Sequence, residues 1–291
     1  MQLGLPDRYP STCALPFNRV SLEQDFQLST PDQDPGTDGV WLLLSGQNVL
    51  TCLTEEGPGL PDQPVAGESL EEALYIGNWR DRPCRMLKVK DFVLGNSQLQ
   101  AHSLQSQNPQ IPLALLSLAG VGLMIQHWEE SSRFCGYCGQ PMIRLPGEWG
   151  KQCTACGKHH FPRIHPCSIG LVVKGDEILL VRKPEWKPAR YGLVAGFVEF
   201  GESLEQAMAR EIAEETGIQV NNIRYVGSQC WPFPSQIMNG FVCDYVSGEI
   251  KLQEDELAEA DWYRLDQLPE LPPRRSIARY LIDQAADYLN I

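Results

Sequence analysis

The sequence has no apolar run long enough to span a membrane. The longest such run, residues 111–125, is too short and is interrupted by Pro112, Gly120 and Gly122. We therefore expect it to be a buried core helix. Residues 1–18 are broken by prolines and lack the apolar centre of a signal peptide. From these two absences we expect a cytoplasmic protein.

Positive charge is also scarce. The 291 residues include 24 Lys and Arg against 37 Asp and Glu, which gives a formal net charge of −13. This balance argues against broad nucleic-acid affinity through a basic surface. An anionic substrate would have to be held by local cations, either a metal ion or arginine. The length predicts two domains with room for a small insert.

The chain has ten cysteines, and without a secretion signal we expect thiols or metal ligands in place of disulfides. Four of them form two CxxC pairs separated by fourteen residues, a spacing typical of a zinc ribbon. A redox CxxC is normally single. The predicted site is structural, because four thiolates leave no position open for catalysis. The predicted zinc ligands are Cys135, Cys138, Cys153 and Cys156.

Other polar residues near the ribbon leave this interpretation unchanged. His159 and His160 could replace a ligand, but four cysteines already complete a tetrahedron. Ribbons also bind nucleic acid, yet the basic residues around this one are few and Glu148 offsets them. We favour a ribbon that separates two domains.

Residues 196–218 carry the strongest local pattern in the chain. Ser203 and Gln206 have the spacing of a capping box, and Gly217 suits a left-handed C-cap. These signals predict a helix from Leu204 to Thr216.

Acidic and apolar residues share one face of this predicted helix. The apolar stripe consists of Leu204, Met208 and Ile212. Glu211 and Glu215 fall within the stripe and Glu214 flanks it, so three carboxylates are expected to point inward, with Arg210 on the opposite face. Like charges one turn apart are unfavourable unless a cation lies between them. Such oxygen ligands suit Mg²⁺ or Mn²⁺. An acidic, solvated helix end is the alternative, and it fits the wheel less well.

The same stretch has the spacing of the box that names the Nudix hydrolases. Nine fixed positions over twenty-three residues agree: Gly196, Glu202, Arg210, Glu211, Ile212, Glu214, Glu215, Gly217 and Ile218. Through them the sequence resembles this family. The resemblance implies hydrolysis of a nucleoside diphosphate linked to another moiety, and an α/β/α sandwich around a mixed sheet.

The remaining elements follow from periodicity and turn residues. Residues 1–38 read as an irregular lead-in and residues 54–67 as a loop. In the first region we expect strands at 40–44, 49–53, 73–77 and 85–89 and a helix over 112–130, without a catalytic constellation. In the second we expect strands at 168–173, 177–182, 223–228 and 240–246 and a helix over 275–289. Within the loop 183–192, Lys187 or Arg190 could meet a phosphate, although solvated charges are the simpler interpretation.

Residues 228–236 read SQCWPFPSQ, with Trp231 and Phe233 held between prolines. Such a rigid aromatic pair suits stacking on a flat base. Packing of both rings into the core is the alternative. The segment is similar to the signature that follows the box in the NADH pyrophosphatases of the Nudix family, the NudC type. Two departures are Cys230, where that group has proline, and the order Ser235-Gln236.

This resemblance covers the whole chain, loosely over the first 130 residues, and implies a division into domains and a reaction. It implies an N-terminal α/β, Nudix-like, non-catalytic domain at 1–130, a zinc ribbon at 131–163 and a catalytic domain at 164–291. The implied reaction is hydrolysis of NADH or NAD⁺ to a nicotinamide mononucleotide and AMP, and removal of NAD caps from RNA 5′ ends. Relatives of this type are homodimers.

The resemblance also implies roles for individual residues. The implied ligands of Mg²⁺ or Mn²⁺ are Glu211, Glu214, Glu215, Glu256 and the carbonyl group of Ala195. Glu215 would also polarise the attacking water, Arg210 would orient a carboxylate, and Glu254 is a rival to Glu256. The implied substrate contacts are Gln229, Cys230, Trp231, Pro232, Phe233, Pro234, Ser235 and Gln236, with Glu148, Phe161 and Ala278.

Two other functions fit parts of the sequence. One is a Nudix hydrolase of ADP-ribose or a dinucleoside polyphosphate, against which the Trp-Pro-Phe-Pro segment argues. The other is a non-catalytic nucleotide- or RNA-binding sensor. The acids at 211, 214 and 215 argue against a sensor, because a protein that only binds has no need of inward carboxylates.

Overall fold

The computed structural model describes residues 3–65, 69–90, 98–186 and 190–289. They form two compact units. The first contains residues 1–5, 16–164 and 231–235, and the second contains residues 6–15, 165–230 and 236–291. Among the described residues, no helix is both long and apolar enough to cross a membrane. Lys187 lies outside the described residues.

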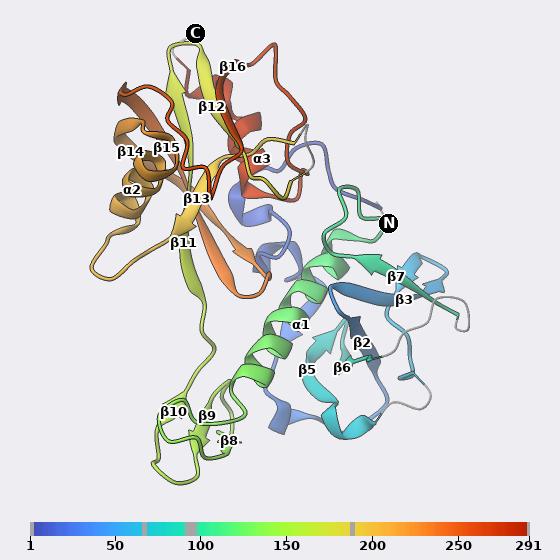
Figure 1. Ribbon diagram of the computed structural model, residues 1–291. Helices are drawn as coiled ribbons and strands as arrows, with labels where there is room; N and C mark the ends of the chain where they lie inside the picture. Colours follow the sequence, from blue (N-terminus) through green and yellow to red (C-terminus); the bar gives the residue numbers. More distant parts are fainter. Residues whose placement is uncertain (1–2, 66–68, 91–97, 187–189, 290–291) are drawn as a thin grey trace. The chain divides into compact units, whose positions relative to one another are not determined.

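The first unit contains a seven-stranded sheet with strand order β1-β5-β6-β2-β3-β4, and β7 pairs with β3 (Figure 1). Strands β2 and β6 are parallel, and the other pairs are antiparallel. The strands are β1 (Phe26–Leu28), β2 (Val40–Ser45), β3 (Asn48–Thr54), β4 (Gly57–Gly59), β5 (Leu74–Trp79), β6 (Arg82–Lys88) and β7 (Leu99–Ser103).

Helix α1 (Leu113–Ser131) contains the predicted apolar run and packs on this sheet. Gly122 permits the close approach, because a Cβ there would lie 2.6 Å from the side chain of Leu42. The prediction of a buried helix is confirmed. Two others were wrong: the lead-in contains β1 and short 3₁₀ turns, and the loop at 54–67 contains β4.

The predicted ribbon also belongs to the first unit. Its three-stranded sheet has the order β10-β9-β8, formed by β8 (Met142–Arg144), β9 (Lys151–Cys153) and β10 (His159–His160). Lys151 is buried, with its ammonium group 2.7 Å from Glu129 and 5.0 Å from the centre of the Trp128 ring. This lysine therefore stabilises the unit and contributes no exposed positive charge.

The second unit is an α/β/α sandwich around a mixed sheet of order β14-β15-β11-β12-β16, with β13 paired to β11 (Figure 1). Strands β11 and β15 are parallel, whereas β11–β12, β11–β13 and β12–β16 are antiparallel. The strands are β11 (His165–Lys174), β12 (Glu177–Arg182), β13 (Val194–Phe197), β14 (Gln219–Trp231), β15 (Gln236–Ser247) and β16 (Glu259–Arg264). The predicted fold class is confirmed.

Two helices cover opposite faces of this sheet. A Cβ on Gly170 would lie 2.7 Å from Met208 of α2 (Leu204–Thr216), and one on Gly240 would lie 2.8 Å from Ile277 of α3 (Ile277–Asp283). Gly240 pairs with Ile169, and the next residue along β11 is Gly170. Because successive residues of a strand face opposite sides of the sheet, Gly240 and Gly170 face opposite sides. The predicted helix over 275–289 is in fact shorter, and a 3₁₀ turn (Ala285–Asp287) follows it.

Candidate active site

Helix α2 begins and ends where the sequence predicts. The Ser203 hydroxyl accepts a hydrogen bond from the Gln206 N–H at 3.2 Å, and the Ser203 N–H donates to the Gln206 side chain at 2.8 Å. Gly217 ends the helix in the left-handed region at φ 74°. The capping box and the glycine C-cap therefore fix the first and last turns, between which the acids of the box are spaced.

Gly196 of β13 lies directly against the acid face of α2. A Cβ at this position would overlap the carboxyl group of Glu211. Any larger residue would displace that carboxylate, which accounts for the glycine at the start of the box. Ala195 is the preceding residue of β13 and pairs with Ile169.

Arg210 holds several acids of the box in place. Its guanidinium group binds both carboxylate oxygens of Glu202, at 2.6 and 3.0 Å, and donates to the Phe197 carbonyl at 2.9 Å. It also donates to Glu211 at 2.9 Å and to Glu214 at 3.0 Å. Charge-assisted hydrogen bonds of this kind fix side-chain geometry. Arg210 therefore contacts three carboxylates of the box.

The helical wheel was wrong about two side chains. Arg210 lies on the acid side of the helix, because its long side chain reaches back to Glu202 and to β13. Glu214 does not point inward, since 56% of its side chain is exposed. A wheel records only the direction of each Cβ, whereas these side chains follow their ion pairs.

Glu215 is the buried acid of the site, with 3% of its surface exposed. Burial raises the pKa of its carboxyl group to about 7, while nearby Lys183 lowers the pKa and Glu211, Glu256 and Glu214 raise it further. Its Oε2 has no hydrogen-bond partner among the described residues. A buried, unpaired carboxylate oxygen beside other acids is a group that a bound cation would stabilise.

Glu256 is brought to Glu215 by backbone hydrogen bonds. The Gln253 N–H donates to the Glu215 carbonyl at 3.1 Å, and the Glu256 N–H donates to the Gln253 carbonyl at 2.9 Å. Lys183 then lies 3.5 Å from Glu256 and 4.0 Å from Glu215. The charge of Glu256 is one of those that raise the pKa of Glu215. The geometry therefore favours Glu256 over Glu254.

These acids fit the divalent cations that Nudix hydrolases use. Carboxylates and carbonyl groups are the hard oxygen donors that Mg²⁺ and Mn²⁺ prefer. The buried oxygen of Glu215 has no hydrogen-bond partner among the described residues, so it is available to bind a cation.

The four predicted zinc ligands come together in the first unit. Their Sγ atoms all lie within 4.8 Å of one another, and three of the separations are 3.4, 3.5 and 3.7 Å. Zinc–sulfur bonds of about 2.3 Å place tetrahedral sulfurs about 3.8 Å apart, so the cluster fits zinc. The Cys156 N–H donates to the Cys153 sulfur, and this hydrogen bond lowers the pKa of that thiol to about 6, favouring the ligating thiolate. None of the ten cysteines forms a disulfide, in line with the expectation of thiols or metal ligands.

The predicted aromatic pair packs with a third ring of the first unit. Trp231 and Phe233 are half-buried, and their centroids lie 5.9 and 5.8 Å from that of Phe17, both edge to face. A Cβ on Gly120 would lie 3.1 Å from Pro232. Each ring therefore has a packed side, in line with the core alternative, and also an exposed portion.

Other predicted substrate residues differ in accessibility. Gln229 is fully buried: its amide nitrogen donates to the Arg275 carbonyl and its oxygen accepts from the Ile277 N–H, both at 2.7 Å. Ser235 is buried and donates to the Arg163 carbonyl, and Ala278 is buried in α3. Burial raises the pKa of the Cys230 thiol to about 11. The exposed or half-exposed ones are Glu148, Phe161, Pro234 and Gln236.

Sequence reasoning missed Lys183 as a site residue. It is the first residue of the loop 183–192, in which only Lys187 and Arg190 were considered, and no local pattern sets it apart. Arg190, from the same loop, is 3.9 Å from Glu270. Arg190 is therefore ion-paired, and with 24% of its side chain exposed it is less solvated than expected.

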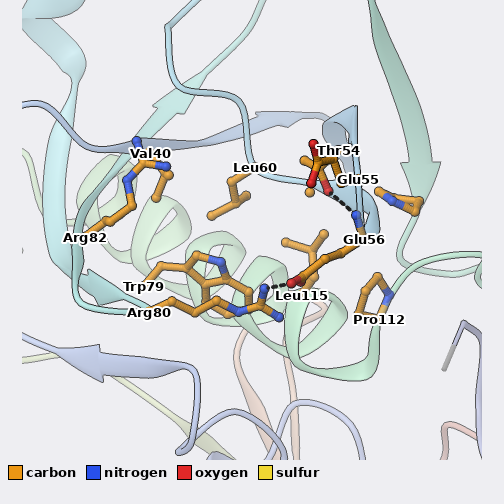
Figure 2. Close-up of a pocket in the computed structure, with 12 residues that line it drawn as sticks. Val40, Thr54, Glu55, Glu56, Leu60, Trp79, Arg80, Arg82, Pro112 and Leu115 are labelled. Carbon is orange, nitrogen blue, oxygen red and sulfur yellow. Dashed lines mark hydrogen bonds and ion pairs between the residues drawn. The ribbon is translucent and has the colours of Figure 1, made fainter. Parts of the chain in front are cut away.

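A separate hollow of about 360 Å³ lies in the first unit. Apolar residues that line it include Leu60, Trp79 and Leu115, and Figure 2 shows the ion pair between Arg80 and Glu56. The guanidinium nitrogen of Arg80 lies 2.9 Å from the Glu56 carboxylate. The rim arginines are ion-paired, Arg82 with Asp62 at 2.8 Å. Two acids, Glu55 and Glu56, are among the residues that line this hollow.

Two family models match the chain. One is described as the NUDIX domain and covers residues 164–285, and the other as the NADH pyrophosphatase zinc ribbon domain and covers residues 130–161.

Curated relatives match over a larger share of the chain. A protein of Pseudomonas aeruginosa named NAD-capped RNA hydrolase NudC is 43% identical over 212 residues, which are 72% of this chain and 74% of the relative. Proteins of the same name from Klebsiella pneumoniae and Escherichia coli are 42% and 41% identical, over 84% of this chain and 93% of each relative. The chain is therefore a Nudix hydrolase with a zinc ribbon and belongs to the NudC family.

Proposed function

We propose that this hydrolase cleaves the pyrophosphate bond of NADH and NAD⁺, giving NMN(H) and AMP, and removes NAD caps from RNA 5′ ends. The observation that carries the proposal is the group of acids around the buried carboxyl of Glu215, held by Arg210 and closed by Glu256. The names of the relatives and the Trp-Pro-Phe-Pro segment support the choice of substrate.

The reaction adds water across a phosphoanhydride. A water oxygen bonds to one phosphorus, the bond from that phosphorus to the bridging oxygen breaks, and both products leave as phosphate monoesters. Bound Mg²⁺ or Mn²⁺ supplies charge neutralisation on the diphosphate and a more acidic water. Glu211, Glu214, Glu215 and Glu256, with the Ala195 carbonyl, are the groups proposed to hold it.

The residues of this chain are proposed to orient the acids, to accept a proton from the attacking water and to contact the rings of the substrate. Arg210 fixes Glu211 and Glu214, so these carboxylates lose little freedom on binding. Glu215 is proposed to accept the proton of the attacking water, because it is the buried carboxyl group at the centre of the acids. Trp231 and Phe233 are proposed to contact a base or the nicotinamide ring through their exposed portions.

Three further features belong to the proposal. We propose the division into domains at 1–130, 131–163 and 164–291. A homodimer and a cytoplasmic location are proposed on the resemblance to the NudC type.

The test is product analysis with NADH, ADP-ribose and an NAD-capped RNA, each with Mg²⁺ or Mn²⁺. We expect NMNH and AMP from NADH, with little product from ADP-ribose. Glu215→Gln and Glu256→Gln should abolish turnover while nucleotide binding is retained. Glu254→Gln is the matched control, two residues from Glu256 and exposed, and it should remain active. Unchanged turnover in Glu215→Gln would contradict the assignment of Glu215 as an essential acid. Turnover of ADP-ribose alone would show that the protein has a different Nudix substrate.

A further inference from the structure

Lys183 occupies the space between two acids of the site. Its ammonium group lies 3.5 Å from a carboxylate oxygen of Glu256 and 4.0 Å from one of Glu215. Only 23% of the Lys183 side chain is exposed, so the contact is largely shielded from solvent.

The backbone directs Lys183 into this position. It follows Arg182, the last residue of β12, which binds Glu259 of β16 at 2.5 Å. Adjacent side chains along an extended chain point to opposite sides, so Lys183 turns away from Glu259. The Ala258 N–H donates to the Arg182 carbonyl at 2.8 Å, which keeps the segment with Glu256 beside the end of β12.

Arg210, a second cation among the described residues of the site, is already engaged by other groups. Arg210 binds Glu202, Glu211 and Glu214 and the Phe197 carbonyl. Among the residues that the structure describes, Lys183 is the cation that ion pairs join to Glu215 and Glu256.

We propose that Lys183 is an internal counter-cation of the acid site, which bridges Glu215 and Glu256 in the metal-free protein and must be displaced when a divalent cation binds them. The inference rests on the proposed function, because it takes these two acids as metal ligands. Lys183 is a positioning residue in this account: it keeps two like charges in place until the metal ion arrives.

Competition between two cations for the same carboxylates has a measurable consequence. By linkage, each lowers the affinity of the site for the other, and couplings of this kind are about 10-fold. Removal of the ammonium charge should therefore strengthen metal binding, whereas loss of a metal ligand or of the local fold would weaken it. The opposite signs separate this role from a merely structural one.

The experiment is a Mn²⁺ titration of the full-length protein with its zinc retained, followed by electron paramagnetic resonance. Lys183→Met should bind Mn²⁺ about 10-fold more tightly than the wild type, and Lys183→Arg should restore weak binding. Lys174→Met removes the same charge from a lysine that lies over Tyr245 and Trp262, and it should leave Mn²⁺ affinity unchanged. The metal concentration for half-maximal NADH hydrolysis should fall in parallel in Lys183→Met.

Unchanged or weaker Mn²⁺ binding in Lys183→Met would overturn the inference. Two further variants, Glu215→Gln and Glu256→Gln, show whether a negative result refutes only the role of Lys183 or also the proposed metal site. If both weaken Mn²⁺ binding while Lys183→Met has no effect, the metal site stands and the competition is wrong. If neither weakens Mn²⁺ binding, the assignment of the acids fails and the inference fails with it.

Discussion

Glu215→Gln should stabilise the metal-free protein at pH 8 by about 3 kcal/mol. Burial raises the pKa of this carboxyl group from its ordinary value of 4.5 to about 7. One unit of pKa corresponds to about 1.4 kcal/mol of difference between the two protonation states. The folded protein therefore keeps Glu215 protonated at pH values where the unfolded chain has released the proton. Glutamine has nearly the shape of the protonated acid and carries no charge to bury.

The sign follows from proton binding. Between pH 4.5 and 7 the folded state binds more protons at Glu215 than the unfolded state, so wild-type stability falls as pH rises through this window. The advantage of Glu215→Gln should be less than about 1 kcal/mol at pH 5 and complete at pH 8.

Thermal unfolding at both pH values, with zinc retained and no divalent cation added, measures the effect. A Tm rise of about 3 °C per kcal/mol is expected for a unit of this size. Glu205→Gln is the control, since Glu205 is exposed on the same helix, and it should not gain stability between pH 5 and pH 8. Equal Tm values for Glu215→Gln and the wild type at pH 8 would refute the reasoning.

Two other changes test the local geometry. Gly196→Ala should lower kcat about 100-fold with little change in Tm. The added Cβ displaces the Glu211 carboxylate, and a displacement of about 1 Å at an active site has an effect of this size. NADH hydrolysis above half the wild-type rate would contradict this prediction. Cys153→Ser should abolish stoichiometric zinc binding and expose residues 131–163 to proteolysis, because structural zinc contributes folding free energy. Full zinc content by atomic absorption, with unchanged protease resistance, would contradict the four-thiolate site.

The helix of the active site was predictable because its signals are local. The capping box, the C-cap glycine and the spaced acids all lie within residues 196–218, and short-range geometry is enough to place them. The zinc ligands were predictable for the same reason, since each CxxC pair forms one turn around the metal.

Features that depend on distant partners were missed. Strand β1 has only three residues and forms because β5 supplies its hydrogen-bond partners about fifty residues later in the chain. Gln229 was assigned to substrate by its place in a motif, yet its amide is used by backbone groups of Arg275 and Ile277. Whether a polar side chain meets a substrate or the core depends on such partners, which the sequence around it does not contain.

The position of the segment 253–258 along its hydrogen-bond partners determines whether Glu254 or Glu256 lies at the site. Both are exposed acids in one short segment, and composition treats them alike. The backbone separates them, because Gln253 is tied to the carbonyl of Glu215 and Ala258 to the carbonyl of Arg182. Between these two fixed points Glu256 meets Lys183 beside Glu215. A slip of two residues would put Glu254 there instead, so the unequal effects expected of Glu256→Gln and Glu254→Gln test the register of the segment as directly as they test the chemistry.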